Sequence, residues 1–377
     1  MPQEKPVLTG FHAIHANHLE ELRRAVVWIC RQHPVPPLAS ETFLVQSNGI
    51  AQWLKLALAE DPSGDADGGL GIAAGMVFLF PSRFIWQAYR AVLPDDEVPE
   101  QSPFDKSRLV WRLFRLLPIL VHQQDVFSPL QRFLDGAHAD TRCYQLAGQI
   151  ADLFDQYQVF RADWLTAWEG GQDSIELARG EVRELPEEQR WQPVLWRALV
   201  QDVAELSATS RSRIHTRFME HGQKLTANDR PPGLPERIIV FGVSSLPRQA
   251  LEALFVLSRI SQVVLCVHNP CEFFWADIIS DRDLLTASRR RGKNHDKLAN
   301  LTDPDTLHQH ANPLLAAWGK QGRDYIRLLD EFDNPDDYQS WVTTPDGRID
   351  IFSSHGSADR PRVLHQIQDD IRTLTSQ

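Results

Sequence analysis

Cysteine is scarce in this sequence, and long apolar runs are missing. The 377 residues include four cysteines, which are scattered along the chain: Cys30, Cys143, Cys266 and Cys271. So sparse a set excludes a small disulfide-bonded scaffold and is typical of a protein kept in a reducing cytoplasm. No signal peptide or membrane span is visible, so we expect a cytoplasmic protein with no membrane partner.

An excess of basic residues is missing as well. Lys and Arg total 39 against 50 Asp and Glu, which gives a net charge of −11. A freestanding nucleic-acid binder is usually basic, so this balance argues against that class but leaves a local basic channel open. The length and the ordinary share of hydrophobic residues, 42%, predict two or three globular domains.

A strand, a turn and a helix follow one another near the N-terminus. Residues 43–45 form an apolar run typical of a strand, residues 46–49 a polar turn, and residues 50–60 carry apolar side chains at helical spacing. This order is where a nucleotide-binding loop would lie, and such a loop needs the pattern G-x-x-x-x-G-K-[ST] to hold phosphate.

The turn lacks the residues that such a loop requires. It offers the side chains of Gln46, Ser47 and Asn48 with a single glycine and no lysine. Amide side chains are poor phosphate clamps, but they pair well with base edges because each carries a donor and an acceptor. The Gly-Lys pairs at 292–293 and 319–320 do not follow strands, so we expect no ATPase activity and no cofactor.

The rest of the chain alternates between strand-like and helix-like patterns, with one long exception. From residue 102 to about 218 the apolar residues keep helical spacing and strand-like runs are absent, which predicts an all-helical insertion. On either side, strands paired with helices predict a parallel α/β fold. We expect a short strand and a turn within residues 10–18, and strands at 43–45, 76–80, 238–241, 263–267 and 349–353. We expect helices at 19–32 (with Asn17 as N-cap), 50–60, from 81, 249–260, 314–332 and from 360.

Two patterns could be read as metal sites. The loop at residues 61–69 has acidic spacing partly like that of a calcium loop, but Ala74 stands where a bidentate acid is needed, which favours a solvated turn. Cys266 and Cys271 flank His268, yet no second ligand pair follows at zinc-finger spacing. Cys266 lies within an apolar run and is predicted to be a buried core thiol.

Two polar clusters have both a plain and a functional interpretation. Asp152, Asp155 and Gln156 are three and four residues apart, so they share one helix face, and Arg161 follows them. The face is either simply solvated or a polar surface that reads bases, with the arginine on phosphate or base. The basic residues within 289–297 are likewise either a solvated loop or a contact to a DNA backbone.

Several long motifs resemble the RecC family, the gamma subunits of bacterial exodeoxyribonuclease V. The resemblance covers nearly the whole chain, and because the family's chains are much longer, this chain is similar to an N-terminal portion of them. The motifs that carry it include Leu44-Val45-Gln46-Ser47, Pro81-Ser82 with Phe84-Ile85-Trp86, Ala151-Asp152-Leu153-Phe154-Asp155-Gln156-Tyr157, Asn269-Pro270-Cys271 and Asn312-Pro313-Leu314-Leu315-Ala316.

The resemblance implies an inactive superfamily 1 helicase-like fold, with a P-loop-type parallel sheet, in a non-catalytic subunit. Family members hold RecB-like and RecD-like motor subunits together, help to split duplex DNA, and scan the 3′-ended single strand for the Chi hotspot during recombinational repair. It also implies four segments: 1–100 and 231–345 as the two parts of one α/β domain, 101–230 as the insertion, and 346–377 as the start of a next domain.

Matched motif by motif, the resemblance implies a set of DNA-scanning residues. Asn48 and Phe80 replace a Thr and a Leu of the best-known family pattern, so the hotspot sequence is left open, and Arg213 is an alternative to Arg211. An active ATP-dependent translocase and a purely structural adaptor without DNA contact are the competing hypotheses. The implied residues are Gln46, Asn48, Gln52, Phe80, Trp86, Asp152, Leu153, Asp155, Gln156, Arg161 and Arg211.

Overall fold

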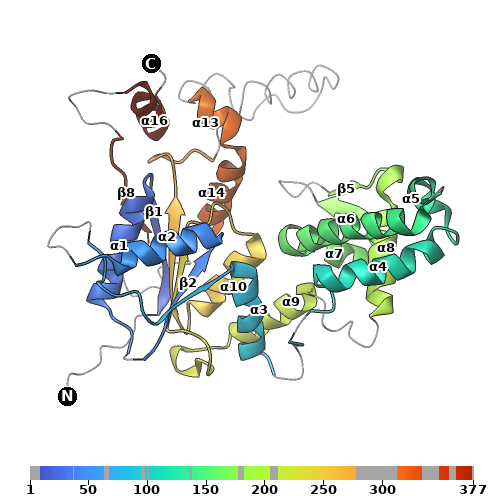
Figure 1. Ribbon diagram of the computed structural model, residues 1–377, viewed down its shortest axis with the longest axis horizontal. Coiled ribbons are helices and arrows are strands. Elements are labelled where there is room, and N and C mark those ends of the chain that lie inside the picture. The colour runs from blue at the N-terminus through green and yellow to red at the C-terminus, as the bar shows by residue number, and fades with distance from the viewer. Residues whose placement is uncertain are drawn as a thin grey trace.

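A computed structural model describes most of the chain. In it, an α/β body is joined through α3 and α9 to a second, mainly helical body (Figure 1). The described residues are 9–36, 38–62, 68–94, 98–100, 102–135, 138–176, 182–203, 211–276, 312–332, 348–355 and 362–375. The calcium-like positions within 63–67 and the basic cluster at 289–297 lie outside them.

The α/β body is built on a six-stranded sheet in the order β3-β2-β6-β7-β1-β8, and every neighbouring pair is parallel. Helices cover both faces, so the central strands are apolar throughout rather than alternating. The predicted parallel α/β fold is confirmed at this level. The strands are β1 (Gly10–Ala16), β2 (Glu41–Val45), β3 (Met76–Leu79), β6 (Arg237–Phe241), β7 (Gln262–His268) and β8 (Arg348–Ile351).

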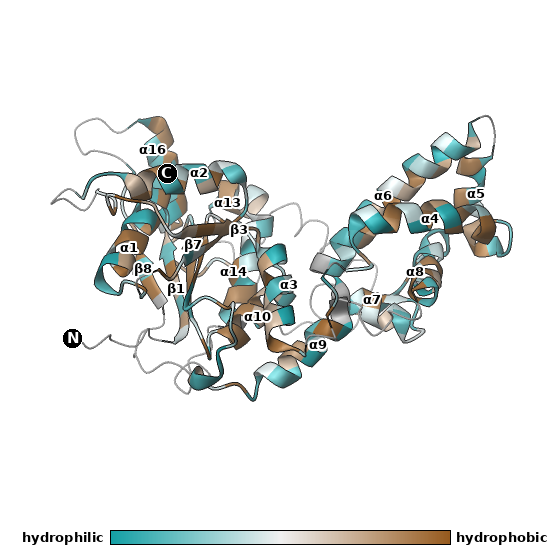
Figure 2. Ribbon diagram, turned by 60° about the horizontal axis from the view of Figure 1, so that its bottom comes forward, coloured by the Kyte–Doolittle hydropathy of each residue, from teal (hydrophilic) through white to brown (hydrophobic). Residues whose placement is uncertain are grey.

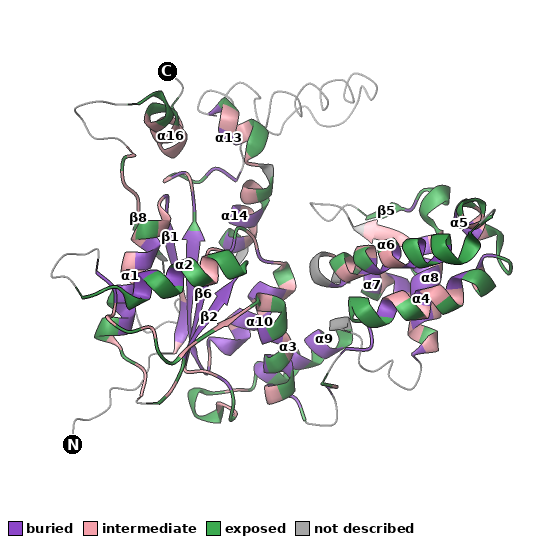
Figure 3. Ribbon diagram, viewed as in Figure 1, coloured by how far each residue is buried: buried purple, intermediate pink, exposed green. Residues whose placement is uncertain are grey.

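Successive strand residues point to opposite faces of the sheet, and each face has its own core. Ile239 and Phe241 pack with α1 (Leu19–Gln32) and α2 (Asn48–Ala59). Ile238 and Val240 pack on the opposite face, against a second group of helices. Figure 3 shows the strands buried between these layers. The second group comprises α3 (Pro81–Val92), α9 (Arg211–Gly222), α10 (Arg248–Leu257), α13 (Pro313–Trp318) and α14 (Lys320–Phe332).

The helical body has a separate core with buried Phe154, Trp168 and Trp196 at its centre. Its helices alternate polar and apolar residues, as the mixed colours in Figure 2 show, because each buries one stripe against its neighbours. Its helices are α4 (Lys106–Leu120), α5 (Ser128–Leu134), α6 (Ala139–Phe160), α7 (Ala162–Glu169) and α8 (Trp191–Asp202), with short 3-10 turns at Asp125–Phe127 and Glu187–Gln189.

The prediction that this region is all-helical was wrong. β4 (Ser174–Glu176) and β5 (Val182–Glu184) form an antiparallel pair. Each strand is three residues long and holds one large aliphatic residue, Ile175 or Val182, so neither produced an apolar run that the pattern could detect.

Three local predictions also need correction. The helix predicted over 314–332 is divided at Gly319, where a Cβ would collide with the carbonyl of Leu315. Asn17 is not an N-cap, because His18 holds that position and Asn17 bonds to Ser353 instead. Helix α2 begins at Asn48, and the Ser47 hydroxyl caps it by accepting from the Ile50 N–H at 3.2 Å.

The C-terminal segment packs against the same body. β8 pairs with β1 in the sheet, with Ile349 opposite Ile14, although residues 346–377 were predicted to start a next domain. A further helix, α16 (Val363–Thr373), is tied to residues 354–355 through Asp369, whose carboxylate accepts from Ser354 Oγ at 2.8 Å and from the His355 N–H at 3.0 Å.

Replacing Asp369 by asparagine is expected to lower stability near neutral pH but not in strong acid. Desolvation would raise the pKa of Asp369, but hydrogen bonds from His355, Ser354 and Arg372 outweigh it and lower the pKa to about 2. A depressed carboxyl pKa contributes stability above the unfolded value of 3.8, and this contribution is lost as pH falls toward about 2. The thermal midpoints of the two proteins, measured from pH 7 downward, should therefore converge in acid. An unchanged gap at about pH 2 would contradict the assignment.

Candidate nucleic-acid interface

Two crevices open at the carboxyl edge of the sheet, where ligands bind in parallel α/β folds. One lies between β2 and β6, because the helices that follow these strands cover opposite faces. Only Gln46 and Ser47 separate β2 from α2, and Gln46 Oε1 accepts from both the N–H and the hydroxyl of Ser244 at 3.1 Å. Beyond β6, Gly242 has φ of +64°, and a Cβ there would press on Ile50. The Gln46 side chain therefore joins the two turns at this crevice, and a small pocket remains beside it.

At the second crevice, between β1 and β7, the side chain of Asn17 turns away from β7 and toward the residues after β8. Asn17 donates from its side chain to the Ser353 carbonyl at 2.8 Å and accepts from the Ser353 N–H at 3.1 Å. The Asn17 carbonyl lies 3.1 Å from His268 Nε2, and burial lowers the pKa of His268, which favours the neutral ring. Only Asn17 and His18 separate β1 from α1, so neither turn has the length of a phosphate-cradling loop.

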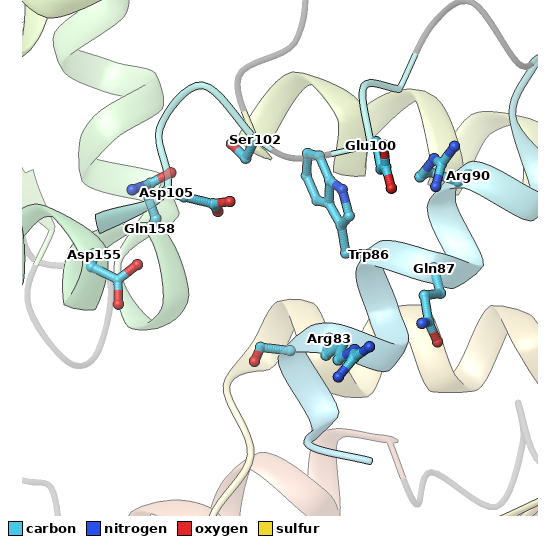
Figure 4. Close-up of a pocket in the computed structure, with 10 residues that line it drawn as sticks. Arg83, Trp86, Gln87, Arg90, Glu100, Ser102, Asp105, Asp155 and Gln158 are labelled. Carbon is cyan, nitrogen blue, oxygen red and sulfur yellow. The ribbon is translucent and has the colours of Figure 1, made fainter. Parts of the chain in front are cut away.

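An open cavity of about 500 Å³ lies instead where α3 meets the helical body (Figure 4). Trp86 projects into it from α3 and Asp155 from α6, so segments far apart in sequence form opposite walls. Apart from the indole, the lining is polar and carries both signs of charge. The lining residues are Ser82, Arg83, Trp86, Gln87, Arg90, Glu100, Ser102, Asp105, Asp155 and Gln158.

The indole of Trp86 is half-buried and held in place. Its Nε1–H donates to the Pro99 carbonyl at 3.2 Å, and its ring meets Tyr89 edge-on with centroids 6.2 Å apart. The hydrogen-bonding capacity of the ring is thus already used by the protein. What Trp86 offers a ligand in the cavity is an aromatic surface for stacking.

The opposite wall carries a carboxylate beside a cation. Asp155 is half-buried, and one turn earlier Asp152 pairs with Lys106 at 2.5 Å. The hydrogen bond to Asp152, its charge and the charge of Asp155 raise the pKa of Lys106. On the same side, the Gln158 amide donates to the Phe104 carbonyl at 3.0 Å, which fixes the segment before α4.

A smaller pocket of about 220 Å³ adjoins the cavity, and Ser82 lines both. Gln46 lies at its polar rim, whereas Ile85, Leu246 and Pro247 make its floor apolar. The structure therefore brings Trp86 and Asp155 into one cavity and places Gln46 in the next.

The other expected scanning residues lie around these two pockets rather than in them. Asn48 and Gln52 are exposed one turn apart on α2, and Phe80 is 44% exposed at the start of α3. On α6, Asp152 and Gln156 are exposed and Leu153 is half-buried. Arg161 pairs with Asp163 at 2.7 Å and stacks 3.9 Å from the Trp164 ring centroid. Arg211 begins α9, and its side chain is outside the described part.

Sequence reasoning missed the charged wall of the cavity. Ser82, Arg83, Gln87 and Arg90 accompany Trp86 at spacings that place them together on one face of α3. That polar face is visible in the sequence and could have been found. Glu100 and Gln158 could not, because only the packing of the helical body brings them there.

No metal site accounts for the remaining candidate ligands. Cys266 is a buried core residue on β7, as predicted, and burial raises the pKa of its thiol. Cys271 is buried as well and accepts from the Phe273 N–H at 3.4 Å. Among the described residues, no group of three or more His, Cys, Asp or Glu could hold a metal ion. None of the described helices has the length and apolar character to cross a bilayer.

Comparison with known proteins gives one consistent result. The family model described as RecC, N-terminal domain, matches residues 11–374. RecBCD enzyme subunit RecC of Escherichia coli K12 is 36% identical over 376 residues, which cover 96% of this chain and 30% of that protein. RecBCD enzyme subunit RecC of Haemophilus influenzae is 35% identical over 85% of this chain and 30% of its own length.

A more distant relative, RecBCD enzyme subunit RecC of Mycolicibacterium smegmatis, is 26% identical over 89% of this chain. The chain thus spans about 30% of the length of the two more similar relatives. The matched region includes both walls of the cavity and the turns that follow β1 and β2. The chain belongs to the RecC family, in which it corresponds to the N-terminal domain.

Proposed function

We propose that this chain is the N-terminal, DNA-handling part of a non-catalytic subunit of exodeoxyribonuclease V. In a cytoplasmic complex with RecB-like and RecD-like motor subunits, it helps to split duplex DNA and guides the 3′-ended single strand. It scans that strand for a Chi hotspot, which serves double-strand break repair by homologous recombination. The α/β body would be an inactive superfamily 1 helicase domain with the helical body as its insertion.

The observation that carries this proposal is the chemistry of the cavity between α3 and α6. Single-stranded nucleic acid needs aromatic faces for bases, polar groups for base edges and cations for phosphate. Trp86 supplies the first, Asp155 the second, and Arg83 and Arg90 the third. A carboxylate accepts from the amino groups of cytosine or guanine, which gives the cavity a means of telling bases apart.

The two turns at the carboxyl edge support the non-catalytic half of the proposal. Phosphoryl transfer needs a lysine and a run of N–H groups around the phosphates. Each turn is two residues long and has no lysine, and at the β2 turn Gln46 bonds to Ser244 instead. Turns of this kind lack the parts that grip a triphosphate, which argues against the translocase alternative.

Gln46→Ala and Asp155→Ala are expected to leave unwinding by the assembled complex near the wild-type rate while weakening its response to the hotspot. Asp155 lines the cavity, so its loss removes a carboxylate from the wall that meets the bases in this proposal. The hotspot response should fall about 5-fold to 100-fold, which corresponds to the free energy of one or two base contacts. It is measured as the fraction of product ends that lie at the hotspot.

Two controls separate the competing functions. Glu184→Ala on β5 removes an exposed carboxylate that pairs with Arg190 outside the cavity, and it should retain the hotspot response. A normal hotspot response in both cavity variants would refute the site. DNA-stimulated ATP hydrolysis by this chain, purified free of the motor subunits, would refute the non-catalytic assignment and favour a translocase.

A further inference from the structure

The helical body carries an aromatic cluster that the cavity does not use. Trp111 on α4 is 63% exposed and Tyr144 on α6 is 49% exposed, with ring centroids 5.7 Å apart. Phe114 completes the cluster, at 6.3 Å from Trp111 and 6.2 Å from Tyr144. Large aromatic side chains gathered on a surface mark an interaction site rather than a core.

The charge around this cluster differs from that of the chain as a whole. Helix α4 carries Lys106, Arg108, Arg112 and Arg115 and no acidic residue, in a protein of net charge −11. Asp202 pairs with both Arg112 and Arg115, and Asp152 pairs with Lys106, so two acidic residues are the partners of three of these cations. Arg108, Trp111 and Arg115 are three to seven residues apart, so basic and aromatic side chains alternate along one exposed face.

The cluster lies on the same helix pair, α4 and α6, as the cavity wall that carries Asp155. Lys106 meets Asp152 near the cavity end of the α4–α6 pair, and Cys143 meets Phe114 farther along it, so the two helices run antiparallel. Tyr144 and Asp155 are eleven residues apart on α6, a distance of about 16 Å along the helix. A strand that leaves the cavity past Asp155 would therefore reach the aromatic cluster along this helix pair.

Gly148 lies on α6 between Tyr144 and the cavity, in the middle of a helix. A glycine there lowers helix stability, so a reason for it is expected in packing or in ligand approach. No packing reason exists, because a Cβ at Gly148 would meet no heavy atom within 4 Å. The missing side chain instead lets a ligand approach the backbone of α6, between the aromatic cluster and Asp152.

We propose that Trp111, Phe114 and Tyr144 form a second stacking platform for the bases of single-stranded DNA, beyond the cavity and reached over Gly148. The inference rests on the proposed function, since it extends the path of the same strand. Stacking tolerates any base, and the cations of α4 serve its phosphates, so this surface holds the strand without reading its sequence.

Photo-crosslinking in the assembled complex tests the platform. The 3′-ended strand carries 5-iodouracil at successive positions, and tryptic peptides are examined after irradiation. Crosslinks are expected on residues 84–90, which contain Trp86, and on 109–112 and 143–161, which contain Trp111 and Tyr144. In Gly148→Leu the added side chain blocks the approach, so crosslinking to 109–112 should fall about tenfold while that to 84–90 is retained.

Gly148→Ala is the matched control. It gains the same helix propensity but adds only a methyl group in open space, so both crosslinks should persist. Crosslinks on 84–90 without any on 109–112 would overturn the platform and leave the proposed function standing. Crosslinks on neither would overturn both. Protection of 109–112 from hydrogen exchange on assembly without DNA would mark a protein interface and also overturn the platform.

Discussion

Arg237→Ala is expected to destabilise the α/β body by about 3–5 kcal/mol, the usual consequence of removing one partner of a buried ion pair. Arg237 is fully buried at the start of β6. Its guanidinium donates to Glu41 Oε1 at 2.6 Å, to Gln262 Oε1 at 2.7 Å and to the His33 carbonyl. It thereby joins β2, β6 and β7 at one edge, and alanine leaves the Glu41 carboxylate without its cation.

The loss should depend on pH in a defined direction. Burial raises the pKa of Glu41, and the charge of Arg237 opposes that rise. Without the arginine the pKa rises further, so the folded state binds more protons than the unfolded state above the ordinary value of 4.5. Stability of the variant therefore falls as pH rises through this window. Urea unfolding at pH 4.5 and pH 7.5 should show the larger deficit at the higher pH.

A double substitution separates the ion pair from simple packing. Glu41→Leu with Arg237→Met replaces both charges by apolar side chains of similar size, and it should recover most of the stability that Arg237→Ala loses. Arg237→Lys keeps the charge but not the planar fork, so an intermediate loss is expected. If the double variant were as unstable as Arg237→Ala, the buried charge on Glu41 would not be the cause.

Trp86→Ala is expected to weaken binding of single-stranded DNA about 5-fold to 150-fold, which corresponds to about 1–3 kcal/mol for one stacked base. The indole lines the cavity, and its N–H is already bonded to the Pro99 carbonyl. Its remaining capacity is the ring face. Equilibrium binding is measured with the complete subunit and a labelled oligothymidine, at a single stated salt concentration.

Trp86→Phe tells stacking from a structural role. Phenylalanine keeps an aromatic face but cannot donate to Pro99, so it should restore most of the affinity if stacking is the cause. If the hydrogen bond to Pro99 were what mattered, both variants would bind equally poorly. Trp28→Ala is the matched control, since Trp28 is 59% exposed on α1, which packs on the opposite face of the sheet from α3.

Local pattern was enough to place most of the regular elements. Helix α1 has the predicted bounds of 19–32, and β6, α10 and β7 lie within three residues of their predictions. These elements have strong apolar periodicity, which a single sequence displays directly. The three-residue strands β4 and β5 and the break at Gly319 were missed. Strands β4 and β5 are too short to show an apolar period, and the break at Gly319 depends on a close contact with Leu315.

The residues of the candidate site likewise fall into those that local sequence indicates and those that only tertiary packing brings together. Residue types and helix spacing sufficed to single out the acid face of 152–156 and the amides of the 46–49 turn, and family motifs added Trp86. Only the tertiary structure decided that Trp86 and Asp155 share a cavity while Gln46 lines the adjoining pocket. Sequence spacing shows which side chains share a face of one helix. Which two helix faces meet depends instead on how the two bodies pack together, and that is decided by the whole chain.

The sequence by itself determined the parallel α/β layer, the long helical region and the loss of a phosphate-binding loop, because each follows from residues adjacent along the chain. The fold decided what lies at the two crevices: Gln46 bonds to Ser244 at the first, and the Asn17 carbonyl lies beside His268 at the second. It also decided where an open cavity remains. Those outcomes depend on pairs distant in sequence, whose meeting is set by the burial of apolar surface in two separate cores.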